Sequence, residues 1–451
     1  MKEPAVLFRE TLVSLLEEKK YPTLRDVLVT LNPADIAALF EELPADRLPL
    51  LFRLLPKELA AETFVEMEPD EQELLIRGFS DNELKEVIDE LYLDDAVDIV
   101  EEMPANVVKR ILRSADPDTR KMINEILKYP EDSAGSIMTI EYVRLRRQFT
   151  VEQAIKHIRR TGIDKETIYT CYVTDDNRRL LGFVSVKTLL LSDEEASIED
   201  VMETNVIYVY TTEDRETVAN LFHKYNFIAL PVVDEEQRLV GIVTVDDAFD
   251  VMQEEYTEDI EKMAAITPSG KPYLKTSVFA LWKARIPWLL LLMISATFTG
   301  MIITAFEQAL AAQVTLAAFI PMLMDTGGNC GSQSSATVIR GLSLDEIEFS
   351  DLLRVQWKEI RVAVLCGVTL AAASFAKLLL FDKVTLAVAL VVCVTLAATV
   401  LCAKVVGCTL PILSMKVGFD PAVMSSPFIT TIVDAISLML YFSVATAVLG
   451  L

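Results

Sequence analysis

Short apolar segments separated by proline run through roughly the first 130 residues. LNPADIAALFEELP, LPLLFRLLP, KELAAETFVEMEP and DDAVDIVEEMP are examples, with apolar residues at steps of three and four positions. This spacing gathers apolar side chains on one helix face, and proline favours a helix start or stop. The segment Pro33–Pro44 also resembles Leu93–Pro104, at an offset of 60. The pattern predicts a helical N-terminal domain over residues 1–131, with short helices stacked into a superhelix.

A clearer duplication follows between residues 132 and about 252. IYTCYVTDDNRRLLGFVSVKTLLL (168–191) aligns with FIALPVVDEEQRLVGIVTVDDAFD (227–250) at an offset of 59. Each copy predicts a strand, an acidic turn, a second strand and the start of a helix. This pattern resembles a tandem pair of CBS domains, a regulatory α/β module. The two predicted domains cover residues 132–198 and 199–252.

The resemblance to CBS pairs makes ATP a candidate ligand, because such pairs often bind adenine nucleotides between their copies. The first copy, however, carries Lys187–Thr188 where many nucleotide-binding copies have Arg–Asp. A regulatory scaffold without a nucleotide therefore stays open beside ATP binding. No residue is assigned to a nucleotide site.

The last part of the chain consists of long apolar stretches. Residues 246–266 predict one acidic helix that leads through TPSGKPYLKT to the apolar part, so 253–275 is assigned as a connecting helix and linker. Polar residues interrupt the second apolar segment, and Gly407 and Pro411 break the fourth. Residues 276–451 therefore predict a five-helix, all-α transmembrane domain at the end of a multi-domain membrane protein. Each segment has about the ~20 residues that a bilayer-crossing helix needs; the segments are about 286–306, 312–339, 362–381, 384–413 and 427–450.

Charge follows the same division of the chain. Residues 1–270 carry 30 lysines and arginines against 57 aspartates and glutamates, whereas residues 271–451 carry 12 against 10. The acidic first part disfavours nucleic acid as a partner and attracts cations. By the positive-inside rule, the basic residues near the segment ends place the N-terminal domains in the cytoplasm and the C-terminus outside a plasma membrane. These basic residues are Lys283, Arg285, Arg340, Arg354, Lys358, Arg361 and Lys416.

The second apolar segment contains PMLMDTGGNCGSQSSATVI (321–339), which is unusually polar for a lipid-facing helix. Close packing between helices explains its small residues. It does not explain Asp325 and Asn329, because a polar group within hydrocarbon needs a protein partner or a water-filled path. We therefore favour a pore lining that includes Asp325, Gly328 and Asn329, with helix packing as the alternative.

The fifth segment, SSPFITTIVDAISLMLYF, places a single carboxylate, Asp434, among apolar neighbours. A charge at mid-bilayer depth costs ~2.5–3.5 kcal/mol on insertion scales, so this side chain is expected to face a cavity or a cation. Thr430 and Thr431 lie four and three positions earlier and offer hydroxyl groups nearby. The alternative is an ion pair between Asp434 and Lys377 or Lys404.

The candidate ligands are hard oxygen atoms, which suit Mg²⁺, Ca²⁺ or Mn²⁺ better than softer metals. Only two histidines, His157 and His223, are present, so a zinc site is not expected. The sequence also lacks the phosphate-binding loop of an ATPase, which favours passive transport. The residues alone do not choose among the three ions.

Taken in order, the helical N-terminal domain, the CBS pair, PMLMDTGGNCGSQSSA and DPAVMSSPFITTIVDA resemble the MgtE magnesium channel family over nearly the whole chain. The resemblance implies a homodimer with a shared pore, a connecting plug helix and passive uptake of Mg²⁺. It also implies that Asp434 is the ion-binding acid of the pore and that the Gly–Gly–Asn region of the second segment lines the path.

Acidic clusters in the first part of the chain are candidate ligands for regulatory Mg²⁺. Steps of three and four positions place several of them on shared helix faces. We expect cytosolic Mg²⁺ to bridge these acids between domains and to hold the channel closed, because without the ion like charges repel and the domains separate. The candidates are Asp94, Asp95, Asp98, Asp214, Glu216, Asp246, Asp247, Asp250, Glu254, Glu255, Glu258 and Asp259.

Two other functions stay open from the sequence. A membrane-anchored CBS-domain sensor of nucleotide or metal would conduct no ions, and an ion-coupled exporter would move the same divalent metal outward. Asp434 and the polar second segment argue against the sensor, because an anchor needs neither. The sequence does not separate the exporter from the channel. An enzyme is not expected, because no nucleophile–base arrangement or phosphate loop is visible.

Overall fold

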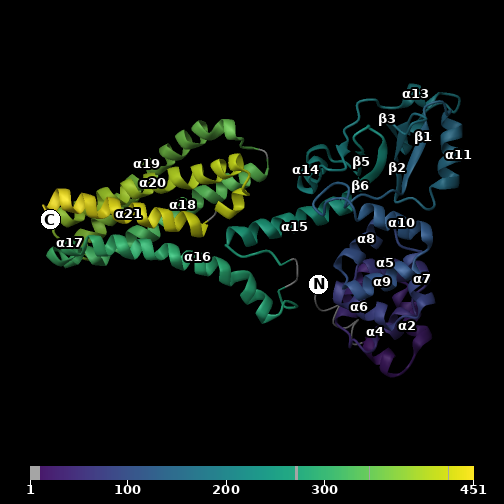
Figure 1. Cartoon of the computed structure of the whole chain (residues 1–451), viewed down its shortest axis with the longest axis horizontal. Helices are drawn as coiled ribbons and strands as arrows, with labels where there is room; N and C mark the ends of the chain where they lie inside the picture. Colours follow the sequence, from purple (N-terminus) through teal and green to yellow (C-terminus); the bar gives the residue numbers. More distant parts are fainter. Residues whose placement is uncertain (1–10, 270–272, 345, 425, 451) are drawn as a thin grey trace. The chain divides into compact units, whose positions relative to one another are not determined.

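The computed structural model describes residues 11–269, 273–344, 346–424 and 426–450. The chain divides into two compact units, Met1–Met252 and Gln253–Leu451. Figure 1 shows the first unit as a group of short helices followed by two small sheets, and the second as a bundle of long helices. The predicted order of a helical domain, a duplicated α/β region and a C-terminal region of long apolar helices is confirmed.

The short helices of the first unit begin where the sequence supplies a start signal. Pro33, Pro69 and Pro117 stand in the first turn of their helices, where a missing N–H loses no hydrogen bond. Their core includes Phe52, Phe64 and Phe79, whose ring centroids lie 5.3 to 6.4 Å apart. The helices are α2 (Tyr21–Leu28), α3 (Pro33–Glu41), α4 (Leu48–Phe52), α5 (Lys57–Val65), α6 (Pro69–Gly78), α7 (Asp81–Ile88), α8 (Leu93–Glu102), α9 (Ala105–Ser114) and α10 (Pro117–Ile126).

The duplicated region forms two three-stranded sheets with the same topology. In each, the first strand pairs parallel with the second, and the second pairs antiparallel with the third. The Tyr142 hydroxyl of the first copy donates to the Leu239 carbonyl of the second, 3.1 Å away. The first copy contains β1 (Tyr142–Arg146), α11 (Val151–Thr161), β2 (Thr167–Thr174), β3 (Leu180–Ser185) and α12 (Val186–Leu191); the second contains α13 (Ile198–Val201), β4 (Val209–Tyr210), α14 (Arg215–Tyr225), β5 (Ala229–Val233) and β6 (Leu239–Thr244).

The second unit is a bundle in which α18, α20 and α21 pack against one another (Figure 1). Glycine permits the closest approach, because a Cβ at Gly407 of α20 would collide with the carbonyl oxygen of Gly331 on α18. The acidic helix α15 (Val245–Met263) runs from the first unit into the second. The bundle contains α16 (Val278–Ala305), α17 (Glu307–Ala312), η1 (Val314–Phe319), α18 (Ile320–Ser343), η2 (Phe349–Asp351), α19 (Leu352–Leu380), α20 (Leu386–Val417), η3 (Pro421–Met424) and α21 (Ser426–Leu449).

Two local expectations about the apolar segments were wrong. The fourth segment is not broken, because α20 continues through Gly407 and Pro411. A membrane helix tolerates proline where neighbouring helices pack against it, and α20 packs against both α18 and α21. The polar stretch of the second segment likewise lies within one continuous helix, α18. The irregular backbone precedes it, in η1.

Among the described residues, four helices are long and apolar enough to cross a bilayer. They correspond to the first, third, fourth and fifth predicted segments: Val278–Ala305, Phe349–Leu380, Leu386–Val417 and Pro421–Leu449. The second predicted segment is represented by α18, whose polar side chains keep it out of that group. As a membrane span, α18 stays a prediction. Its length of 24 residues is sufficient to cross the hydrocarbon core.

Candidate cation path and acidic cluster

The polar stretch of the second apolar segment divides into different faces of α18. Gly327 and Gly331 pack inward: a Cβ at Gly327 would lie 2.7 Å from Thr399 Cγ2 of α20, and one at Gly331 would lie 2.6 Å from Ile429 Cγ2 of α21. Asp325 and Asn329 are exposed in the single chain. Close packing between helices therefore accounts for Gly327 and Gly331, which was the alternative given in the sequence analysis. Asp325 and Asn329 lie on another face.

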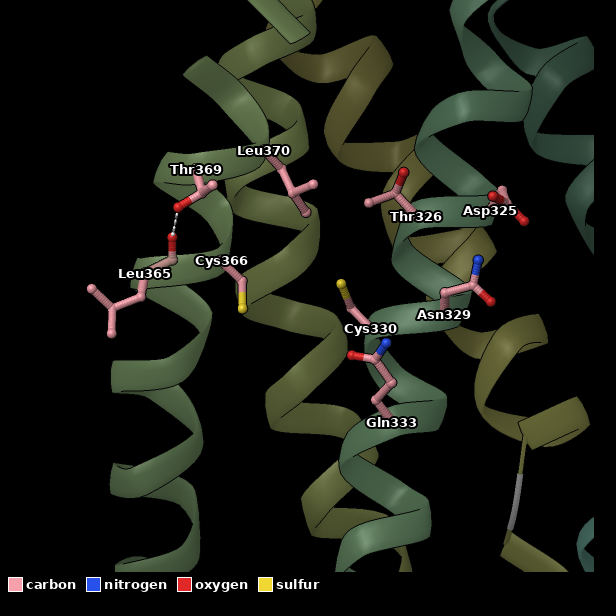
Figure 2. A pocket seen from close by; sticks show the side chains of 9 residues that line it. All are labelled: Asp325, Thr326, Asn329, Cys330, Gln333, Leu365, Cys366, Thr369 and Leu370. Atoms are coloured by element: carbon pink, nitrogen blue, oxygen red, sulfur yellow. Dashed lines mark hydrogen bonds between the residues drawn. The ribbon is translucent and has the colours of Figure 1, made fainter. Parts of the chain in front are cut away.

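A cavity of about 480 Å³ lies between α18 and α19. Figure 2 shows Thr326 and Cys330 on the side of α18 that faces α19, whereas Asp325 and Asn329 lie at the far edge. The cavity thus includes two of the predicted pore residues. Its full lining is Asp325, Thr326, Asn329, Cys330, Gln333, Leu365, Cys366, Thr369 and Leu370.

Asp434 lies half-buried on α21. The charged side chain that acts on it electrostatically is Asp325 of α18, an acid and not a base. Of the two lysines proposed as alternative partners, Lys377 pairs with Asp382 at 3.2 Å and Lys404 pairs with Glu359 at 3.5 Å. Within the described residues, Asp434 therefore forms no ion pair. Two carboxylates from neighbouring helices face the same region, which favours a cation there.

The remaining predicted pore residues lie at the contact between α18 and α21. A Cβ at Gly328 would lie 2.9 Å from Thr430 Cγ2, so Gly328 and Thr430 are in contact. The hydroxyls of Thr430 and Thr431 both donate to the Pro427 carbonyl, at 3.0 and 2.9 Å. Their oxygen atoms keep lone pairs that can accept from an ion's water shell. The structure thus brings Gly328, Thr430 and Asp434 to one interface.

Acids from α8 and from the start of α15 gather in the first unit. Asp94 of α8 is 6% exposed, and burial together with the charge of Asp247 raises its pKa well above the ordinary value. The same two causes raise the pKa of Asp95 to about 7. Burial raises the pKa of Asp247 to about 6, although the Thr244 hydroxyl, which donates to Asp247 Oδ2 at 2.6 Å, opposes the shift. Asp98 lies one turn further along α8 and is exposed.

The sequence interpretation missed two further acids of this cluster, Glu166 and Glu141. Burial, followed by the charge of Asp246, raises the pKa of Glu166 to about 8, and its Oε2 atom is buried without a described hydrogen-bond partner. Glu141 Oε2 accepts from the Leu93 backbone N–H at 3.1 Å and so ties the start of α8 to the first CBS copy. A signal was present, because Glu166 lies in RRTGIDKET, where the first copy is five residues longer than the second.

The other candidate regulatory acids of the first unit have different surroundings. Asp214 caps α14, because its Oδ1 accepts from the backbone N–H of Glu216 at 2.9 Å and of Thr217 at 3.3 Å. Burial and the nearby Asp246 raise the pKa of Asp250. Asp214 therefore has a structural role at a helix start, in addition to any role with an ion.

The second half of α15 contacts residues at the ends of the bundle helices. Lys262 Nζ lies 2.6 Å from Glu258 Oε1 and 2.7 Å from Asp420 Oδ2, which precedes η3. The Ser343 hydroxyl at the end of α18 donates to Asp259 Oδ2 at 3.3 Å. Glu254 and Glu255 lie on the same helix. Asp420 and Lys262 were not among the predicted residues.

Three or more His, Cys, Asp or Glu side chains are nowhere arranged as a ready metal site within the residues that the structure describes. The acids around Asp94 are neighbours by electrostatics, and they are not preassembled into a coordination shell. Their role as ligands of a regulatory ion stays a prediction. Each of the two units therefore contains carboxylates that lie near other carboxylates.

Comparisons with known proteins show which family the chain resembles. Models of three families match: the MgtE intracellular N domain over residues 31–132, the CBS domain over 134–194 and 198–254, and the divalent cation transporter MgtE over 320–444. The magnesium transporter MgtE of Thermus thermophilus is 39% identical over 443 residues, which cover 97% of this chain and 98% of that protein. The magnesium transporter MgtE of Bacillus subtilis is 34% identical over 437 residues, 97% and 96% of the two chains.

A solved structure extends the likeness to three dimensions. The crystal structure of the cytosolic domain of the Mg²⁺ channel MgtE in complex with ATP has a TM-score of 0.52 and 40% identity. It covers 54% of this chain and 99% of that one. The protein is therefore a multi-domain membrane protein of the divalent cation transporter class. The chain belongs to the MgtE family, which confirms the resemblance inferred from its sequence motifs.

Proposed function

We propose that this protein is a Mg²⁺-selective channel that mediates passive magnesium uptake and is closed by cytosolic Mg²⁺. The observation that carries the proposal is Asp434, a half-buried acid on an apolar helix whose electrostatic neighbour is a second acid, Asp325. Membership of the MgtE family supports Mg²⁺ as the transported ion, since the two full-length relatives are magnesium transporters.

In the proposed path, the ion is held by hard oxygen atoms. Asp434 and Asp325 supply negative charge, and Asn329, Thr430 and Thr431 supply neutral oxygens. Mg²⁺ releases its waters reluctantly, so a site with few carboxylates and several neutral oxygens suits an ion that keeps part of its hydration shell. An inside-negative potential drives a divalent cation inward with ~4.6 kcal/mol per 100 mV, twice the value for a single charge. No coupled energy source is then needed.

We propose that the acidic cluster of α8 and α15 closes the channel when it binds Mg²⁺. Buried acids with raised pKa values are either protonated or in need of a counter-cation. Mg²⁺ bound among Asp94, Asp95 and Asp247 would neutralise them and favour the closed arrangement, because a ligand shifts a conformational equilibrium towards the state that it binds better. Closure would therefore follow the cytosolic Mg²⁺ concentration by mass action.

ATP is a candidate second ligand of the CBS pair. The related cytosolic domain was solved in complex with ATP, which supports binding here. In this chain Lys187 and Thr188 lie in the first turn of α12, where the Thr188 backbone N–H donates to the Ser185 hydroxyl oxygen at 3.0 Å. Isothermal titration of the full-length protein with ATP, with Lys187→Ala as the variant, tests whether this departure from Arg–Asp still permits binding.

The proposed assembly is a homodimer in the plasma membrane with the N-terminal domains in the cytoplasm and the C-terminus outside. Its support is the distribution of basic residues at the segment ends and the largely exposed apolar surface of the bundle helices in the single chain, for example Leu365 at 71% exposure. Surface of this kind contacts lipid or a second copy. Accessibility of an added C-terminal cysteine to a membrane-impermeant reagent tests the orientation.

The decisive experiment is Mg²⁺ flux into vesicles that contain the purified full-length protein, an enclosed Mg²⁺ indicator and an inside-negative potassium diffusion potential. Wild type is expected to carry Mg²⁺ inward at a rate that rises with the potential. Asp434→Asn should reduce the flux to the level of empty vesicles. The matched control is Asp382→Asn, which removes a carboxylate that is paired with Lys377 at 3.2 Å.

The outcomes separate the candidate functions. A silent wild type would support a non-conducting sensor, and outward movement that requires an opposing ion gradient would support an exporter. Wild-type flux in Asp434→Asn would refute the role of that acid.

A further inference from the structure

Three helices of the bundle meet at a buried polar junction formed by Lys404 of α20, Glu359 of α19 and Ser334 of α18. Lys404 is 5% exposed and Ser334 is 2% exposed. Lys404 Nζ lies 3.1 Å from Ser334 Oγ and 3.5 Å from Glu359 Oε2, and the Ser334 hydroxyl donates to the same Glu359 oxygen at 2.6 Å. We call these three residues the Lys404 junction. It contains none of the residues assigned to the ion path.

The junction holds α18 by the face opposite its polar pore residues. Ser334 follows Asp325 by nine positions, which corresponds to about 900° of rotation at about 100° per residue, or half a turn beyond two full turns. Asp325 and Asn329 are four positions apart and therefore lie on the same face of α18. Ser334 and the pair of Asp325 and Asn329 therefore lie on opposite faces of the same helix.

The glycine contacts of α18 fix its distance from its neighbours but supply no directional bond. Gly327 and Gly331 leave no room for a Cβ against the side chains of α20 and α21. Small-residue surfaces of this kind let helices approach closely, and they tolerate small rotations better than a hydrogen-bonded contact does. In the Lys404 junction, by contrast, Ser334 accepts from one charged group and donates to another, which sets an angle as well as a distance.

A buried charge pair of this kind is retained at a cost in stability that a purely apolar contact would avoid. Replacing a buried ion pair by apolar residues is often neutral or stabilising, whereas removing one partner leaves an uncompensated charge. Charged residues within membrane segments are accordingly rare and tend to mark functional positions. Packing alone therefore does not require a lysine and a glutamate here.

We propose that Lys404 is a positioning residue for the ion path: together with Glu359 it holds Ser334 and so fixes the rotation of α18 that presents Asp325 and Asn329 towards the region of Asp434. This inference rests on the proposed Mg²⁺ conduction. Lys404 does not touch the ion. It acts through Ser334 and the helix backbone.

The sharpest test is Ser334→Ala, which cuts the link to α18 and leaves the Lys404–Glu359 pair in place. Flux into vesicles is measured as a function of external Mg²⁺, and the ratio of Mg²⁺ to Ca²⁺ flux is measured beside it. The half-saturating Mg²⁺ concentration is expected to rise roughly tenfold, as the loss of a hydrogen bond to a charged group implies, and the Mg²⁺ preference should fall. A merely stabilising junction would change neither quantity in protein that remains folded.

The matched control is Thr395→Val, which removes a buried hydroxyl of α20 that has no described hydrogen-bond partner. This variant should keep the wild-type half-saturation and ion preference. Both variants must elute as monodisperse protein at the wild-type volume.

A second set of variants tests the charge pair itself. Lys404→Met alone and Glu359→Met alone leave one buried charge unpaired, and each should lose at least tenfold in maximal flux. The double variant removes both charges and should recover most of the maximal flux while it keeps a weakened Mg²⁺ preference, since Ser334 then has no charged partner. If a single variant fails to fold, Ser334→Ala and the double variant decide the question.

Wild-type half-saturation and ion preference in Ser334→Ala would overturn the proposal. A silent wild type would instead refute the proposed conduction, so the two failures are distinguishable.

Discussion

Carboxylates of the two units of this protein are compensated differently. In the bundle, Glu359 pairs with Lys404 and Asp382 pairs with Lys377. In the first unit, the acids around Asp94 lie near other acids, and within its described part neither Asp94 nor Asp95 forms an ion pair. Asp434 resembles the first unit in this respect, although it belongs to the bundle.

The difference separates acids that support the fold from acids that are available to a cation. A carboxylate paired with a lysine already has its counter-charge, so an additional divalent ion gains little there. A carboxylate beside other carboxylates holds its proton more tightly, and a bound cation favours its ionised form. Two regions meet this second condition: the acids of α8 and α15, and the pair of Asp325 and Asp434. We propose that the former senses Mg²⁺ and the latter conducts it.

Neutralising the acids of α8 is expected to have the largest effect on inhibition by internal Mg²⁺. The triple variant Asp94→Asn, Asp95→Asn and Asp98→Asn removes the α8 ligands through which internal Mg²⁺ favours the closed state. Flux at millimolar internal Mg²⁺ should rise roughly tenfold or more over wild type, because the loss of only ~1.4 kcal/mol of differential binding shifts the closed population tenfold. Patch-clamp of excised membrane with Mg²⁺ varied on the cytosolic face measures it.

The control for that triple variant makes the same change in charge at exposed acids of the same unit, with Asp70→Asn, Asp89→Asn and Asp118→Asn. It should be inhibited like wild type. Equal loss of inhibition in both triple variants would mean that overall charge, and not the α8 cluster, governs closure.

The next effect is a pH dependence confined to the acidic cluster. Folded pKa values of about 7 for Asp95 and about 8 for Glu166 lie above the ordinary values of these carboxyl groups. The folded state therefore binds these protons more tightly than the unfolded state. Local stability should fall as the pH rises from about 4, where the unfolded groups ionise, to about 8, where the folded groups have ionised.

Hydrogen exchange of the full-length protein without Mg²⁺, corrected for the intrinsic rate, should show less protection of α8 at pH 8 than at pH 5. Mg²⁺ should restore protection mainly at pH 8. The internal control is α7, where hydrogen bonds from Arg53 and the Ser80 backbone lower the pKa of Glu83 to about 2, so that its charge does not change in this range. Equal protection of α8 at both pH values would argue against ionisable acids as the opening force.

The sequence predicted the domain order and singled out Asp434 as a candidate pore acid, because both inferences depend on local or repeated patterns. Helical periodicity, the offset-59 duplication and long apolar segments are each visible within a few dozen residues. Asp434 is recognisable because a single charge stands out in an apolar helix. Gly407 and Pro411 were misleading, because their local tendency to break a helix is overridden by packing of α20 inside the bundle.

The contacts that the sequence did not predict join positions far apart in the chain. Lys262 and Asp420 are separated by 158 positions, and Lys404 and Glu359 by 45. A residue such as Glu166, in a segment between helix and strand, has no periodic signature, and only the fold brings it beside α8 and α15. Partner choice among many lysines and acids is a property of tertiary structure, so one sequence leaves it open.

The smallest expected effect concerns Lys262, which tests whether Glu258 and Asp420 belong with the paired acids or with the acids that are available to a cation. Its amino group lies 2.6 Å from Glu258 and 2.7 Å from Asp420, so a fixed positive charge occupies a place between two acids where a divalent ion would otherwise bind. Lys262→Gln removes that charge. The internal Mg²⁺ concentration for half-inhibition should fall about two- to fivefold, as expected for loss of a partly exposed ion pair of ~0.5–1 kcal/mol.

Lys121→Gln is the matched control for that change, because Lys121 is exposed on α10 and lies 3.9 Å from Glu125. It should leave the inhibition curve in place. If Lys262→Gln instead needs more Mg²⁺ for inhibition, the lysine acts as a tether that holds α15 closed, and the competition between lysine and ion is refuted. In that case Glu258 and Asp420 belong with the paired acids of the bundle, and the acids around Asp94 and Asp247 carry the proposed sensing alone.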